Sequence, residues 1–301
     1  MVRVTDLSFY ATQSRVTEPG KFAGAIDDMP SSLADIRKAA RELVFHYRAG
    51  GDYAENGIAA DRIAEIDTRY ADAMLARLDQ LGGLRLTEAR KPSQRLLGCC
   101  RDFTVLFLTL ARQHGVPARA RVGFATYFEA GWYVDHVVAE VWDEGEQRWR
   151  LVDAELADDH VDPADGERVD PEDLGSHFLT GPQAWQACRS GAKDPQRFLV
   201  AVDLDIPGIR GWPYIRHNLI HDLASLSKHE MVLWDNWGIL LDAEQTPEQL
   251  ALLDDLAATT VGDAPVEEIL AFYQREDLRV PPVVTSYSPA HQEPLQVAVE
   301  V

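Results

Sequence analysis

Apolar side chains recur at helical spacing in two stretches of the first third of the chain. One stripe begins at Leu33, after the capping residue Ser32, and ends before a glycine pair at Gly50. The second covers 59–81, where apolar residues stand three and four positions apart, and it stops at Gly82. We therefore predict two helices ahead of residue 84, after a first segment without a clear period.

A third helical stripe follows an irregular segment, 84–97. Apolar residues between 103 and 110 again follow helical spacing, and a Gly-Val-Pro turn at 115–117 ends the pattern. The sequence therefore predicts a helix that begins at Cys100 and ends at about His114.

The next segments have the composition of β-strands. Residues 118–124 alternate small or apolar side chains with basic ones, which is typical of a strand at the edge of a sheet. Residues 132–142 and 148–152 are rich in Val, Trp and Tyr and predict two more strands. The acidic segment 158–173, with proline and glycine, is expected to be a solvated surface loop.

Helical patterns return in the last part of the chain, over 183–188, 215–226, 247–256 and 265–273. The tail has few periodic residues and a proline pair, so we expect it to be extended or partly disordered. These patterns divide the chain into a helical N-terminal region, a mixed region, a second helical region and a tail, over 1–93, 94–175, 176–278 and 279–301.

Composition and charge narrow the class of protein. The chain has 301 residues, with 49 acidic and 29 basic ones, so its formal net charge is −20. This charge repels nucleic-acid phosphates and anionic membranes. No apolar run reaches about 20 residues, and the N-terminus lacks the order of a signal peptide. Three cysteines without metal-ligand spacing indicate a reducing compartment, and we expect a soluble, cytoplasmic protein.

The predicted helix start at Cys100 favours a reactive thiol. Unpaired N–H groups and the dipole of the first turn stabilise a thiolate, and the neighbouring Arg101 adds positive charge. The sequence therefore predicts a lowered pKa for the Cys100 thiol. A small buried hydrophobic residue is the alternative for a lone cysteine, and the adjacent Cys99 leaves open which thiol reacts.

A cysteine nucleophile needs a base and a group that orients the base. His136 and Asp153 stand on two adjacent predicted strands. A hairpin that turns at Glu144-Gly145 places them directly opposite each other, about 4.5–5.5 Å apart at Cβ. A turn two residues longer makes them diagonal neighbours, and a slip by one residue puts them on opposite faces.

Several other residues are candidates for a role near Cys100, His136 and Asp153. The first oxyanion donor that we expect is the backbone N–H of Cys100, with Gln94 and the indole of Trp132 as tentative side-chain donors. Asp102 complements the helix dipole, and Asp135 points away from the strand face of its neighbour at 136. His217 and His221 stand four apart on a predicted helix, but no third ligand accompanies them, so we expect no metal.

Four ordered motifs resemble the transglutaminase-like superfamily of cysteine enzymes. They are Gly-Cys-Cys-Arg-Asp-Phe at 98–103, Gly-Val-Pro-Ala-Arg at 115–119, the histidine strand at 135–142 and the aspartate strand at 148–153. The Gly-x-Cys register selects Cys100 as the nucleophile. Segments 184–189 and 223–230 look like those of a bacterial subgroup of the superfamily.

The resemblance implies an α+β, papain-like fold in which the nucleophile helix packs on an antiparallel sheet, with additional helices N- and C-terminal. It implies a catalytic core over 94–175 and a Cys100, His136, Asp153 triad that forms a thioester acyl-enzyme. The substrate would be a peptide, an amide or an acyl thioester, for example on an acyl carrier protein, and an amine or water would accept the acyl group. No cofactor is implied. The alternative is a non-catalytic binding or scaffold protein that retains the fold.

Overall fold

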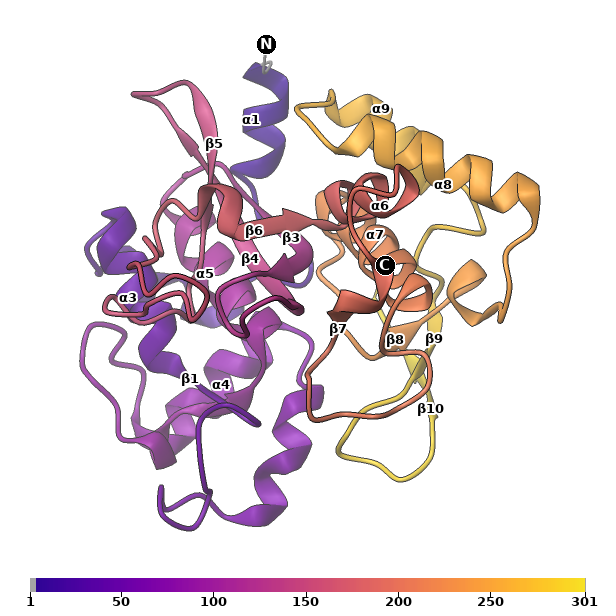
Figure 1. The fold of residues 1–301 in the computed structure, drawn as a ribbon. Coiled ribbons are helices and arrows are strands. Elements are labelled where there is room, and N and C mark those ends of the chain that lie inside the picture. Colours follow the sequence, from indigo (N-terminus) through magenta and orange to yellow (C-terminus); the bar gives the residue numbers. More distant parts are fainter. Residues whose placement is uncertain (1–3, 301) are drawn as a thin grey trace.

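A five-stranded sheet forms the centre of the protein, which a computed structural model describes over residues 4–300 (Figure 1). Four strands follow the order β5-β4-β3-β6 with antiparallel pairing, and a short fifth strand, β7, pairs in parallel with β4. Their bounds are Ala118–Ala125 (β3), Tyr133–Asp143 (β4), Arg148–Val152 (β5), Phe178–Thr180 (β6) and Phe198–Leu199 (β7). The predicted antiparallel sheet is therefore present.

The strand β3 lies in the interior of this sheet, between β4 and β6, and the prediction of an edge strand is wrong. Its two arginines suggested solvent, but both side chains are buried and paired with carboxylates. Arg119 bonds Glu140, and Arg121 bonds Glu140 and Asp222. A buried charge is tolerated only when it is paired, and these pairs allow a basic strand to be fully covered.

Helices cover both sides of the sheet (Figure 1). The nucleophile helix α5, Cys100–Gln113, packs on β3 and β4 together with α3, Leu33–Leu43. Every residue of α5 from 100 to 112 is buried, because α3, α4 and the sheet enclose it. On the other side α7, Trp212–Leu226, packs on β3, and α6, Gly181–Arg189, packs on α7. The expected packing of the nucleophile helix on the sheet is confirmed.

The N-terminal region differs from its helical prediction in two places. The stripe that begins at Leu33 changes to a strand, β1, Val44–His46, which pairs in parallel with β2, Leu96–Gly98. The stretch 59–81 is broken into a 3-10 turn, Ala60–Asp67, and the helix α4, Ala71–Gly82. Two short helices precede these elements, α1, Val4–Tyr10, and α2, Ala23–Asp27.

The C-terminal region is helical as predicted, with α8, Pro247–Thr260, and α9, Val266–Tyr273. The tail is paired rather than free. It forms β9, Val283–Ser286, and β10, Leu295–Ala298, in a small sheet with β8, Asp235–Asn236. Pairing with β8 is a long-range contact that local periodicity does not report. Within residues 4–300, no helix is long and apolar enough to cross a membrane.

Candidate active site

Cys100 is the first residue of α5, and a capping interaction fixes the chain just before it. Cys99 is the extended N-cap residue, and its N–H donates to Asp102 Oδ2 at 2.8 Å. Asp102 therefore lies in the first turn of α5, as expected, and caps the helix start. The N–H of Cys100 has no partner within the helix because of its first position. An N–H in that position is free to stabilise a developing oxyanion.

One side-chain contact ties the first turn of α5 to the histidine strand. Thr104 lies one turn after Cys100, and its hydroxyl donates to the carbonyl oxygen of Val137 at 3.0 Å. Residues four apart lie on the same side of a helix, and Val137 follows His136 directly. The contact therefore holds the nucleophile end of the helix against the strand that carries the base.

His136 and Asp153 form a direct pair. The Nε2 atom of His136 lies 2.9 Å from Asp153 Oδ2. Asp153 also accepts from the Tyr127 hydroxyl at 2.7 Å and from the backbone N–H groups of Glu155 and Leu156 at 2.8 and 3.1 Å. Burial raises the pKa of Asp153, but the charge of His136 and these hydrogen bonds outweigh it, and the pKa lies below its usual value.

The register of the β4–β5 hairpin explains how this pair meets. Trp142 pairs with Trp149, so the turn is two residues longer than the direct opposition requires. The direct opposition of His136 and Asp153 is therefore wrong, and the diagonal arrangement is correct. Gln147 adopts a φ of 54° in the longer turn. The imidazole of His136 spans the offset, since its distal Nε2 atom is the one that reaches Asp153 Oδ2.

The predicted lowering of the Cys100 pKa is wrong. The hydrogen bond with the Cys99 thiol, burial, and the carboxylates Asp135 and Glu155 raise the pKa of the Cys100 thiol well above its ordinary value. Burial lowers the pKa of His136, but the charge of Asp153 and the hydrogen bond with it raise the pKa more, so it lies above its ordinary value. The resting thiol is therefore protonated, and its proton has to leave during the reaction.

Arg101 does not supply the charge that the sequence assigned to it. Its guanidinium is only 2% exposed and donates to the carbonyl oxygens of Glu230 at 2.6 and 2.9 Å and of Arg69 at 2.6 Å. It also bonds Asp102 at 3.0 Å. This arginine therefore ties the helix start to two distant segments, and it is committed to those contacts rather than to the thiol.

Two further carboxyl groups act on the nucleophile through their charge. Asp135 accepts hydrogen bonds from the Tyr214 hydroxyl and the Asn218 amide, both at 2.8 Å, and burial raises its pKa to about 6. These α7 contacts agree with the expectation that Asp135 does not orient the histidine. Glu155 follows the triad aspartate by two residues, and burial raises its pKa to about 7.

The structure does not bring the two tentative side-chain oxyanion donors to the triad. The Gln94 amide packs against Gly82 at the end of α4 and accepts from the Lys91 N–H at 3.4 Å. The guanidinium groups of Arg197 and Arg210 lie over the Trp132 ring, 4.8 and 5.5 Å from its centroid. Their oxyanion roles stay predictions without a contact to the triad in the described residues.

Sequence reasoning missed several residues of the site. Tyr127, which bonds Asp153, comes from the end of β3 and has no motif signal. The Phe128 ring lies edge-on to the His136 ring at 5.0 Å. Tyr47 follows β1, and its N–H donates to the Gly98 carbonyl oxygen at 2.9 Å. Glu155 follows Asp153 by two residues, in a turn after the end of β5.

His217 and His221 have structural surroundings. Their rings stack at 4.1 Å between Tyr214 and Trp237, and His221 Nε2 bonds the Asp235 carbonyl oxygen at 2.9 Å. Burial lowers the pKa of His217 to about 4. No group of three or more possible ligands for a metal occurs within residues 4–300.

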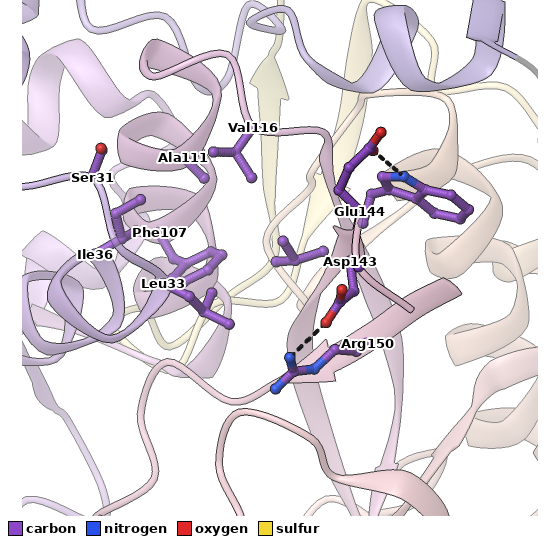
Figure 2. A pocket seen from close by; sticks show the side chains of 12 residues that line it. Ser31, Leu33, Ile36, Phe107, Ala111, Val116, Asp143, Glu144 and Arg150 are labelled. Atoms are coloured by element: carbon purple, nitrogen blue, oxygen red, sulfur yellow. Dashed lines mark hydrogen bonds and ion pairs between the residues drawn. The ribbon is translucent and has the colours of Figure 1, made fainter. Parts of the chain in front are cut away.

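An apolar pocket of about 350 Å³ lies apart from the triad (Figure 2). Its wall includes Leu33 and Ile36 from α3 and Phe107 and Ala111 from α5. Ala111 is three turns along the helix from Cys100, about 16 Å by helical rise. Cys100, His136 and Asp153 are 6%, 2% and 1% exposed, so the catalytic candidates are nearly closed to solvent.

The antiparallel sheet, the helix that begins at Cys100 and the His136–Asp153 pair fit a cysteine-enzyme fold, and the family comparison supports this fold. Residues 83–154 match the model of the transglutaminase-like superfamily, and they contain Cys100, His136 and Asp153. The chain is therefore similar to the transglutaminase-like superfamily over this segment.

The other comparisons add little. A crystal structure from Cytophaga hutchinsonii, provisionally described as a cysteine protease, shares 17% identity and a TM-score of 0.32. The match covers 50% of this chain and 42% of that chain. No curated protein matches the chain.

Proposed function

We propose that the protein is a cysteine enzyme that forms a thioester acyl-enzyme on an amide or thioester substrate and passes the acyl group to an amine or to water. The observation that carries this proposal is the 2.9 Å contact between His136 Nε2 and Asp153 Oδ2. It uses one ring nitrogen of His136 and leaves Nδ1 for the Cys100 thiol. The partners of Asp153 fix the ring in that orientation.

The chemistry follows from the protonation states. His136 takes the proton of Cys100 as the sulfur attacks the carbonyl carbon, because the raised pKa of the thiol keeps it protonated at rest. His136 then gives that proton to the leaving amine or thiolate. In the second half of the reaction His136 activates the incoming amine or water, which attacks the thioester carbon and releases Cys100.

The start of α5 stabilises the oxyanion in this proposal. The backbone N–H of Cys100 is the supported donor, since it is the first residue of α5 and has no intrahelical partner. The dipole of α5 adds to this effect over the first turn.

The first test is intact-mass labelling with iodoacetamide from about pH 5 to 9, a range that covers the ordinary histidine and cysteine values. Wild type, Cys99→Ala, Cys100→Ala and His136→Ala are compared. We expect a single adduct that is lost only in Cys100→Ala and forms more slowly in His136→Ala. An activated ester such as p-nitrophenyl acetate should then leave one acetyl group on Cys100.

The same variants decide against the alternative. A non-catalytic scaffold would label slowly at both neighbouring cysteines and would not retain an acetyl group. Labelling that survives Cys100→Ala and disappears in Cys99→Ala would assign the nucleophile to the other thiol. Either result would overturn the proposal for Cys100.

A further inference from the structure

Glu155 is attached to the triad by the backbone but is not used by it. Its N–H donates to Asp153 Oδ1 at 2.8 Å. The β4–β5 ladder ends at Val152, and the chain then turns around the Asp153 carboxylate, which accepts from the N–H groups of Glu155 and Leu156. Glu155 therefore lies next to the carboxylate that bonds His136.

The carboxylate of Glu155 lacks a partner of its own. The side chain is half-buried, and its Oε2 atom is buried without a hydrogen-bond partner among residues 4–300. The cations that act on it through charge are His136, which bonds Asp153, and Arg41 of α3, which makes no hydrogen bond to it. A buried acceptor without a partner costs about 1–3 kcal/mol, so such an atom in a native site calls for an explanation.

The position of Glu155 is also unfavourable for the nucleophile. Its negative charge is among the causes that raise the pKa of the Cys100 thiol. A glutamine at this position would keep the backbone bond to Asp153 and remove that charge. The charge of Glu155 therefore opposes the thiolate in the resting protein. A positive group of the substrate would give the carboxylate a partner and would also offset its effect on the pKa of Cys100.

We infer that Glu155 is a specificity-determining residue that binds a positively charged group, an ammonium or guanidinium, of the substrate beside the reacting carbonyl. This inference rests on the proposed function, because it assigns the charge of the substrate at the same site. The cation lies on the acyl donor or on the acyl acceptor. In either case it forms the same ion pair with the Glu155 carboxylate. Uncharged substrates leave the carboxylate unpaired and bind less well.

The test uses three methanethiosulfonate reagents that modify Cys100 and carry an ammonium, no charge or a sulfonate. The measured quantity is the ratio of the modification rates of the ammonium and uncharged reagents, in a Cys99→Ala background. Any change in the Cys100 pKa alters all three rates by the same factor and cancels in the ratio. We expect wild-type Glu155 to favour the ammonium reagent and Glu155→Gln to lower the ratio about tenfold.

Two further variants sharpen this test. Glu155→Lys should reverse the preference toward the sulfonate reagent. Asp159→Asn removes the same charge from the same loop and should leave the ratio unchanged, because Asp159 is exposed and is not among the charges that raise the pKa of Cys100. An unchanged ratio in Glu155→Gln, or an equal fall in Asp159→Asn, would overturn the inference. If Cys100 reacts with none of the three reagents, the proposed function is contradicted, and the inference that rests on it is contradicted as well.

The source of the cation is resolved with the acetyl-enzyme. Putrescine and uncharged hydroxylamine are compared as acceptors, and p-nitrophenyl esters with and without a terminal ammonium as donors. A charge preference in acceptor transfer that Glu155→Gln abolishes places the cation on the acceptor. A preference confined to the donor esters places it on the acyl donor. Absence of both preferences contradicts the inference.

Discussion

The hydroxyl of Thr104 donates to the carbonyl oxygen of Val137 at 3.0 Å, and this contact joins the two elements that carry the nucleophile and the base. Thr104 is 1% exposed, so the hydrogen bond is made without competition from water. The distance between the thiol and the imidazole therefore depends on a residue that takes no part in the chemistry.

Replacing Thr104 with valine should weaken the coupling between α5 and β4. The substitution keeps the volume but leaves the buried Val137 carbonyl oxygen without the hydroxyl, at a cost of about 1 kcal/mol in the free energy of unfolding. We expect iodoacetamide labelling of Cys100 to slow by several-fold. The measurements are urea unfolding and intact-mass labelling of the same protein samples.

Thr109→Val is the matched control. Thr109 is buried in the same helix, but its hydroxyl bonds the Val105 carbonyl oxygen of its own helix at 2.8 Å. It should alter stability modestly and leave the labelling rate of Cys100 unchanged. Equal slowing in both threonine variants would mean that helix stability, rather than the contact to β4, sets the reactivity.

Removing a carboxylate beside the nucleophile should make Cys100 more reactive toward an uncharged reagent at neutral pH. The negative charge of Asp135 helps to raise the pKa of the thiol, so Asp135→Asn lowers that pKa. The onset of iodoacetamide labelling should therefore move to lower pH. A profile that does not move, or that moves upward, would show that Asp135 does not act on the thiol.

Tyr127→Phe should weaken the support of the orienting acid. The Tyr127 hydroxyl donates to Asp153 Oδ2 at 2.7 Å, and a hydrogen bond to a charged group contributes about 1.5–3 kcal/mol. Loss of this hydrogen bond raises the pKa of Asp153. As the solution is acidified, Asp153 should therefore become protonated, and its ion pair with His136 should be lost, at a higher pH than in wild type. The pH profiles of labelling and of unfolding, measured on both proteins, test this expectation, and superimposable profiles would refute it.

Acid should destabilise the protein through the buried histidines of α7. The pKa of His217 is about 4 in the folded protein and about 6.5 when unfolded, so the unfolded chain binds the proton first. Stability is therefore lost as the pH falls from about 6.5 to 4, by up to about 3 kcal/mol from this residue. His217→Phe should flatten that part of the stability profile measured by urea unfolding at several pH values. An unchanged slope would contradict a neutral, buried His217.

Arg101→Met should destabilise the protein strongly, by about 3–5 kcal/mol, because Asp102 and several buried carbonyl oxygens lose their donor. Arg101→Lys keeps the charge but not the planar fork that reaches Glu230 and Arg69 together. We expect Arg101→Lys also to lower the urea midpoint, with a labelling profile close to that of wild type. If the pH profile of Cys100 labelling moves to higher pH in Arg101→Lys, Arg101 does activate the thiol.

Local sequence signals predicted the part of the site that lies on single elements. Helical spacing and a Gly-Val-Pro turn placed the helix that begins at Cys100 to within one residue of its observed span, Cys100–Gln113. The composition of 132–142 and 148–152 placed the strands that lead to His136 and Asp153. These signals act over a few residues, so they can be read without the fold.

Tertiary contacts decided the rest, since they join residues far apart in the chain. The interior position of β3 depends on Arg121 and Asp222, which are 101 residues apart. The tail became ordered because β9 pairs with β8, and the length of the hairpin turn chose the diagonal pairing of the triad. The charge around Cys100 comes from Asp135 and Glu155, whose effect depends on burial and distance, which the residue types alone do not specify. The sequence by itself thus determined the candidate residues of the site and the elements that carry them, whereas their electrostatic environment was determined only by the folded chain.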